Sequence, residues 1–109
     1  MKRQLASLAL VALMAAPASA QQILVPSNRA AMETGCLVQG LDPNGDGFLA
    51  LRAGPGSDHA QIGSLRNGDA AYLAAPPAGR WLYVENGAIG GREAKFRGWI
   101  YDAWCQFYP

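Results

Sequence analysis

Ser57, Asp58 and His59 supply the three side-chain types of a hydrolytic triad, and they follow one another directly in the chain. A triad needs its nucleophile, base and orienting acid in line, and these groups normally come from separate elements of the fold. Three adjacent residues cannot adopt that geometry. No pair of carboxylates is singled out for glycosidic cleavage either. We therefore expect no catalytic residues and predict that the protein is not an enzyme.

The segment from Asp42 to Gly47, DPNGDG, matches the first half of a calcium-binding loop. Oxygen donors stand at the first, third and fifth positions, and glycine stands at the sixth. The last position of such a loop would be Ala53, where a bidentate glutamate is needed, and the flanking residues have strand patterns. We therefore interpret the segment as a turn rich in Asx and glycine, and we predict no metal site and no cofactor.

The two cysteines, Cys36 and Cys105, lie at the two ends of the segment that has strand patterns. In an oxidising compartment we expect them to form a disulfide. Such a bridge constrains the unfolded chain by about 4 kcal/mol in the loop-entropy model. Because the pair lacks the C-x-x-C context of a redox site, we predict a structural role for it.

Aromatic residues are the candidates for ligand binding. In the run Trp81-Leu82-Tyr83-Val84, aromatic and aliphatic residues alternate. In a strand, this alternation places one pair in the core and displays the other on the opposite face. If the aliphatic pair faces inward, the aromatic rings are available for binding. The predicted ligand-binding residues are Trp81, Tyr83, Trp99 and Tyr101. Packing in the core is the alternative, especially for Trp99.

Short strands are expected to position these residues. From Cys36 onward, glycine and proline separate β-type segments at intervals of about 8–12 residues, as in small sandwiches and barrels. In one of these segments Leu49 and Leu51 share a face and are expected in the core. The expected strands cover residues 36–41, 48–53, 61–65, 70–74, 81–85 and 96–101. Residues 86–91 are predicted to be the longest hairpin connection, and residues 21–35 to form a flexible N-terminal arm.

Four short motifs occur in order along this part of the chain. They are LALRAGP at residues 49–55, I-G-x-L-x-x-G at 62–68, W-x-x-V at 81–84 and GWI at 98–100. Together they resemble the bacterial Src-homology-3-like (SH3b) domain over about residues 36–107. The resemblance implies an all-β fold, a small SH3-like barrel of five to six short strands over residues 36–109. It also implies binding of peptides or cell-wall components through aromatic residues. Gly98 is expected where a neighbouring group approaches too closely for a side chain.

The first twenty residues have the three parts of a secretory signal. These are Lys2 and Arg3, an apolar run over residues 5–16, and the small residues 18–20. We expect cleavage between Ala20 and Gln21. The apolar run is shorter than the roughly twenty residues that cross a membrane, and Gln21 takes the place where a lipoprotein has cysteine. We therefore predict a periplasmic or secreted protein without a membrane anchor after cleavage.

The charge balance limits the class of partner. Removal of Lys2 and Arg3 leaves seven basic residues against eight acidic residues. This balance provides no basic stripe for nucleic acid. We predict an exported module that binds a peptide or a peptidoglycan-derived ligand of the cell envelope. The alternative is an inhibitor or accessory subunit that docks on another exported protein.

Overall fold

The computed structural model describes residues 22–109, and its regular elements are almost entirely β-strands. The predicted signal sequence and its cleavage site at Ala20 and Gln21 lie outside the described residues. The strands are β1 (Gly35–Val38), β2 (Leu49–Arg52), β3 (Gln61–Leu65), β4 (Ala70–Leu73), β5 (Trp81–Ile89), β6 (Arg92–Tyr101) and β7 (Cys105–Tyr108), and a 3-10 turn, η3 (Asp102–Trp104), precedes β7. The predicted all-β class is confirmed, with one strand more than expected.

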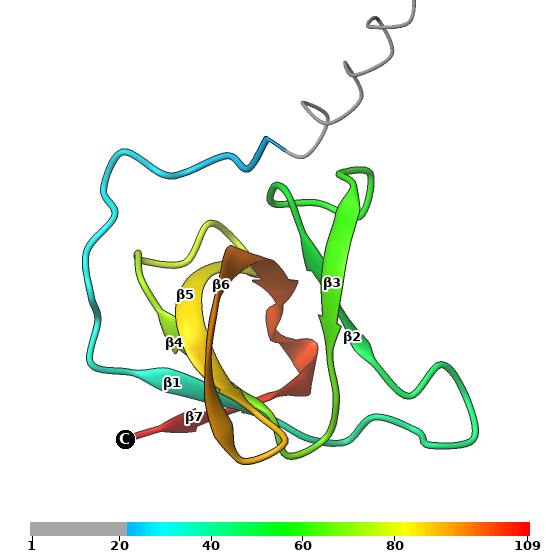
Figure 1. The fold of residues 1–109 in the computed structure, drawn as a ribbon. Helices are drawn as coiled ribbons and strands as arrows, with labels where there is room; N and C mark the ends of the chain where they lie inside the picture. Colours follow the sequence, from blue (N-terminus) through cyan, green and yellow to red (C-terminus); the bar gives the residue numbers. More distant parts are fainter. Residues whose placement is uncertain (1–21) are drawn as a thin grey trace, which may run out of the picture.

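The strands form a single antiparallel sheet in the order β3-β2-β6-β5-β4-β1-β7. The sheet curls around a central core, so that β1 and β7 lie across from β2 and β3 (Figure 1). Within the described residues β3 and β7 remain the two edges of the sheet, and the closed barrel that we expected is therefore not formed. The unpredicted strand β7 extends the sheet beyond β1 and becomes its edge.

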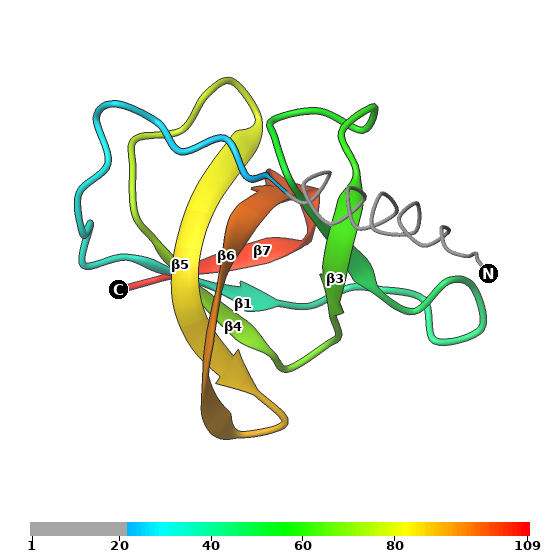
Figure 2. The same cartoon turned by 45° about the horizontal axis from the view of Figure 1, so that its top comes forward.

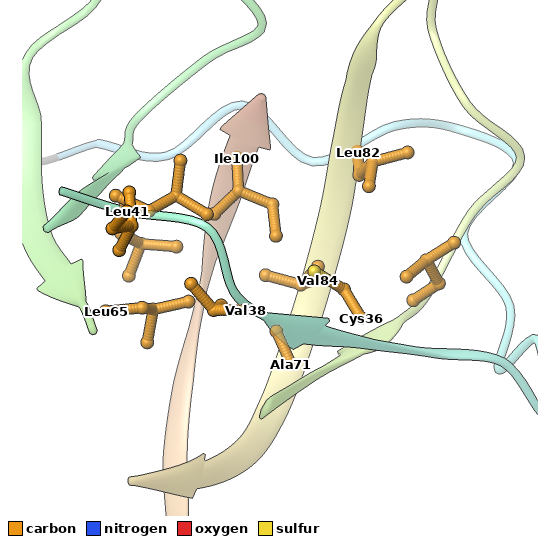
Figure 3. Packing of buried hydrophobic residues seen from close by; sticks show 11 residues of the cluster. Cys36, Val38, Leu41, Leu65, Ala71, Leu82, Val84 and Ile100 are labelled. Carbon is orange, nitrogen blue, oxygen red and sulfur yellow. The ribbon is translucent and has the colours of Figure 1, made fainter. Parts of the chain in front are cut away.

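The main core lies inside this curl and follows the two-residue alternation of the strands. Leu49 and Leu51 of β2 are buried, whereas Ala50 and Arg52 between and after them are half-buried. Figure 3 shows the core side chains of β5, β6 and β1 directed toward one another. The buried cluster contains Cys36, Val38, Leu41, Leu49, Leu51, Leu65, Ala71, Leu73, Leu82, Val84 and Ile100.

Strands β5 and β6 are longer than predicted, because the connection between them is only two residues. Gly90 and Gly91 have φ values of 60° and 81°, as the two central residues of a type I′ hairpin turn require. Residues 87–89 of the predicted 86–91 connection are instead paired with β6, after a bulge between Glu85 and Gly87. A Cβ atom at Gly87 would overlap the Ala70 carbonyl of β4, so glycine permits this close pairing.

Gly98 in β6 has the close neighbours that we expected. A Cβ atom there would come within 2.8 Å of the Arg52 carbonyl oxygen and 3.0 Å of the Leu51 side chain. The missing side chain lets β2 lie against β6, where Arg52 is opposite Trp99. Gly98 thus brings the outer face of β2 beside the aromatic residues of β6.

The predicted disulfide between Cys36 and Cys105 is confirmed. It joins β1 to β7, which also pair as neighbouring antiparallel strands. Cys36 is fully buried in the main core. A disulfide of this kind indicates an oxidising, non-cytoplasmic compartment.

Residues 22–34 contain no helix or strand but differ from the loose arm that we expected. The Leu24 amide donates to the Ala53 carbonyl at 2.8 Å, and the Ala30 amide donates to the Ala74 carbonyl at 2.8 Å. Ile23 and Met32 pack against buried clusters of the domain. Figure 2 shows this segment, in blue, crossing β5 and passing close to the end of β6. The segment is therefore part of the folded domain.

Candidate ligand-binding groove

Two of the four predicted aromatic residues stand together at the surface. Trp81 begins β5 and Tyr101 ends β6, and the antiparallel register places them opposite each other. Their ring centroids are 5.3 Å apart and the planes are tilted by 60°, a favourable arrangement for an aromatic pair. Both side chains are half-buried. The pair presents a rigid, partly open aromatic surface.

Trp81 and Tyr101 form one side of a groove of about 660 Å³. Leu49 and Ala50 of β2 supply further apolar surface, and the loop after β2 forms the other side. The groove is lined by Leu49, Ala50, Arg52, Gly56, Ser57, Asp58, Trp81 and Tyr101. Apolar and aromatic surface with a few convergent polar groups is typical of a ligand site. Arg52 and Asp58 place one positive and one negative charge at its edges.

The loop after β2 is held in position by hydrogen bonds. The Arg52 guanidinium donates from Nη1 to the His59 carbonyl at 3.0 Å, and the Ala53 amide donates to the Ala60 carbonyl at 2.9 Å. A side chain at Gly54 would overlap the His59 ring, so glycine allows the ring to fold back against the loop. This packing fixes the wall that carries Ser57 and Asp58.

Arg80 fixes the aromatic side of the groove. Its Nε and Nη2 atoms lie 2.8 Å and 2.7 Å from Oδ1 of Asp102, and its guanidinium carbon lies 4.8 Å from the centroid of the Tyr101 ring. The Asp102 carboxylate raises the pKa of Arg80 above its ordinary value. The cation and the ring attract each other, so Tyr101 is held against Arg80.

The other two predicted aromatic residues do not line the groove. Tyr83 is fully buried and Trp99 is 4% exposed, and their rings pack together with centroids 5.4 Å apart. They form a second buried cluster with Ala74 and Ala75, against which Ile23 and Trp81 also pack. The prediction of a displayed Tyr83 is therefore corrected. The expected face of the strand is right, but Ala74 and Ala75 together with the N-terminal segment cover it.

Glu85 links this buried aromatic pair to the N-terminal segment. The Tyr83 hydroxyl donates to Oε2 of Glu85 at 2.6 Å, and Nη2 of Arg29 donates to Oε1 at 2.9 Å. The hydrogen bond from Arg29, with help from Tyr83 and the charge of Arg97, lowers the pKa of Glu85 although partial burial opposes this. Burial and the bond to Glu85 raise the pKa of Tyr83. Glu85 is therefore ionised and paired near neutral pH.

Sequence patterns alone do not identify Arg52 as a groove residue, although it belongs to the LALRAGP motif. Its position depends on the long-range register that sets it opposite Trp99.

Ser57 and Asp58 belong to the triad-like run, and both line the groove. Asp58 Oδ1 lies 4.0 Å from Nε2 of His59. The prediction that the protein is not an enzyme stays a prediction.

The calcium-like segment is a turn, as interpreted from the sequence. The Asn44 amide donates to the Asp42 carboxylate at 2.8 Å, and the Gly45 amide donates to the Asp42 carbonyl at 3.0 Å, which is an Asx turn. Within residues 22–109 no group of three or more His, Cys, Asp or Glu side chains is placed to hold a metal ion.

Two further findings concern membrane-spanning helices and similarity to known proteins. In the described part of the chain, no helix has the length and apolar character needed to cross a membrane. No protein-family model, curated protein sequence or solved structure matches the chain. The geometry of the groove is therefore the basis on which a function can be argued.

Proposed function

We propose that the protein is an exported SH3-like binding module, and that it recognises a peptide or peptidoglycan-derived ligand in the groove beside Trp81 and Tyr101. The observation that carries the proposal is the groove itself, in which a tilted aromatic pair faces a polar loop. Aromatic anchors contribute large contact area at binding sites. The disulfide supports a site outside the cytoplasm.

The positions of the four motifs support the SH3-like assignment. The first motif forms β2 and the start of the groove loop, and the second forms β3 and the turn that follows. The third opens β5, and the fourth lies in β6. Motifs one, three and four thus contribute directly to the groove or to the buried pair behind it. Such joint placement is what a binding module built from these motifs requires.

The charges around the groove favour a ligand that carries both an amine and a carboxylate. Arg52 offers guanidinium donors for a carboxylate, because only its Nη1 bond to the His59 carbonyl is committed. Asp58 is 90% exposed at the side chain and can accept from an ammonium group. Short peptides and the peptide stems of peptidoglycan have both groups, and their backbones can lie along the aromatic pair.

Sedimentation with purified peptidoglycan sacculi tests the proposal. The Trp81→Ala variant should bind about thirtyfold more weakly, as for the loss of a central aromatic anchor of about 2 kcal/mol. Trp104→Ala is the matched control, because Trp104 is 40% exposed and does not line the groove. Circular dichroism establishes that both variants are folded. Equal binding by Trp81→Ala and the unsubstituted protein would exclude the groove as the site.

The second candidate function is docking on another exported protein. One observation favours it, because Trp104, Phe107 and Tyr108 are all large, exposed and close to the sheet edge formed by β7. Exposed aromatic residues beside an unpaired strand are suited to a protein interface. The same two variants separate the candidates. If Trp104→Ala releases a bound envelope protein while Trp81→Ala retains it, the docking function replaces the groove function.

A further inference from the structure

Residues 22–32, here called the strap, cross β5 and pass close to the end of β6 (Figure 2). At one end of the strap Ile23 packs against the cluster of Tyr83 and Trp99. The next residue, Leu24, is bound through its backbone. Its amide donates to the Ala53 carbonyl at 2.8 Å, and its carbonyl accepts from Nε1 of Trp99 at 2.8 Å.

A second anchor holds the other end of the strap. Arg29 forms an ion pair with Glu85, and the amides of Ala30 and Met32 donate to the carbonyls of Ala74 and Leu73. Between the two anchors, the chain turns over residues 26–29, and the bond from the Arg29 amide to the Pro26 carbonyl at 3.2 Å closes this turn. The strap is therefore attached at its two ends, with no strand pairing between them.

The contacts of Leu24 are those of a bound peptide. Both of its backbone groups are held by the domain, while the residue is 52% exposed. The preceding residue, Ile23, packs an aliphatic side chain against the cluster that contains Tyr83 and Trp99. Main-chain hydrogen bonds combined with one side-chain pocket are the usual basis of extended-peptide recognition. The domain groups that recognise this backbone are the Ala53 carbonyl and the Trp99 indole.

This surface is continuous with the groove. Trp81 lines the groove and also packs against the cluster of Tyr83 and Trp99. Ala53 directly follows Arg52, which lines the groove as well. A peptide that lay in the groove could thus extend across Trp81 onto the surface that the strap occupies.

We propose that the surface formed by Ala53, Tyr83 and Trp99 is a binding site for an extended peptide with an aliphatic side chain. The strap is its resident intramolecular ligand, which an incoming peptide displaces. As an extension of the groove this rests on the proposed function, but the displacement itself is measurable without any wall ligand. Displacement requires only local opening, because the strap is held at two ends while the sheet beneath it stays paired.

The first experiment measures how strongly the strap protects the Trp99 indole from hydrogen exchange. Ile23→Asp removes the aliphatic anchor, and Val25→Asp is its matched control, since it adds the same charge to the strap at an exposed residue. Hydrogen exchange of the Trp99 indole, followed by NMR in the full chain, should accelerate by about tenfold or more in Ile23→Asp. In Val25→Asp it should remain close to that of the unsubstituted protein.

The second experiment supplies the peptide in trans. The probe is a fluorescent peptide with the sequence of residues 22–29, QILVPSNR, and the control probe carries aspartate in place of isoleucine. The probe should bind the Ile23→Asp protein about tenfold more tightly than the unsubstituted protein, in which the resident strap reduces the competent fraction. The control probe should bind neither protein to a comparable extent.

If Ile23→Asp does not fold, Arg29→Gln is a milder substitution that also weakens the attachment of the strap. It removes the ion pair with Glu85 and no core contact, and it should increase probe binding in the same direction. Two results would overturn the proposal. One is equal probe affinity for the unsubstituted protein and for Ile23→Asp or Arg29→Gln, and the other is unchanged indole exchange in both Ile23→Asp and Arg29→Gln. Sacculus binding that depends on Trp81 in a protein that fails to bind the probe would retain the proposed function alone. Probe binding without sacculus binding would retain the peptide site alone.

Discussion

Leu82 and Tyr83 are consecutive residues of β5, and both are buried, on opposite faces of the sheet. Leu82 packs in the main core, and Tyr83 packs with Trp99 in the second cluster. Trp81 is on the same face of β5 as Tyr83, but it packs at the border of the second cluster and is only half-buried. Strand alternation alone would leave both aromatic rings in the same environment. Burial on this face is therefore decided by the residues packed over it, which are Ala74, Ala75 and Ile23 of the strap.

We therefore expect stability and binding to separate between neighbouring positions. Leu82→Ala should lower the free energy of unfolding by about 2–5 kcal/mol, and Tyr83→Ala by about 3–5 kcal/mol, because each leaves a cavity. Trp81→Ala should change stability less and ligand binding more. Urea unfolding of the three variants measures the first effect, and sacculus sedimentation the second. Strong destabilisation by Trp81→Ala with none by Tyr83→Ala would contradict the burial described here.

The strap is the element whose attachment depends on pH. Arg29, Tyr83 and Arg97 face Glu85, and the hydrogen bond from Arg29 is the main reason that the pKa of Glu85 lies below its ordinary value of 4.5. A carboxyl group with a lowered folded-state pKa contributes stability above its unfolded-state pKa and loses it as the pH falls through the folded-state value. The link between Glu85 and the strap should therefore persist at neutral pH and be lost only below pH 4.5.

Exchange of the Trp99 indole across a pH series measures this attachment, after correction for the intrinsic pH dependence of exchange. Protection should be constant from pH 7 down to about 5 and decrease in more acidic solution. Arg29→Gln should show reduced protection at neutral pH and a smaller decrease on acidification. A decrease centred near pH 6 or 7 would assign the effect to another group and remove Glu85 from the attachment of the strap.

Elements with local signals could be predicted from the sequence. β2 and β3 agree with their expected ranges because alternation and turn residues mark them locally. β7 has no such pattern, and its partner β1 lies about seventy residues earlier in the chain. The docking of the strap is equally non-local, since the Ala53 carbonyl and the Trp99 indole that bind Leu24 are unrecognisable before the sheet is assembled. Trp81 and Tyr101 line the groove, and their role in binding stays a prediction. The burial of Tyr83 depends on Ala74, Ala75 and Ile23, which strand alternation does not reveal.

At the scale of the whole molecule, two segments add to the sheet formed by the other strands. The strap crosses β5 and passes close to the end of β6 (Figure 2), and β7 extends the free edge of β1. They lie at the two ends of the described chain, and each contacts residues that are distant from it in the sequence. The strap is held by hydrogen bonds and one ion pair, whereas β7 is joined covalently through Cys105. The two ends therefore differ in how easily they detach.

The disulfide should accordingly determine stability without determining binding. Its cysteines are 69 positions apart, and closing a loop of that length constrains the unfolded chain strongly. Replacing both Cys36 and Cys105 by serine should lower the free energy of unfolding by about 2–5 kcal/mol, measured by urea denaturation. The folded fraction should still bind sacculi, because the groove residues lie on β2, β5, β6 and the loop after β2. Chemical reduction of the unsubstituted protein is the control and should reproduce the loss. If the reduced, folded protein no longer bound, β7 would have to be counted as part of the binding site.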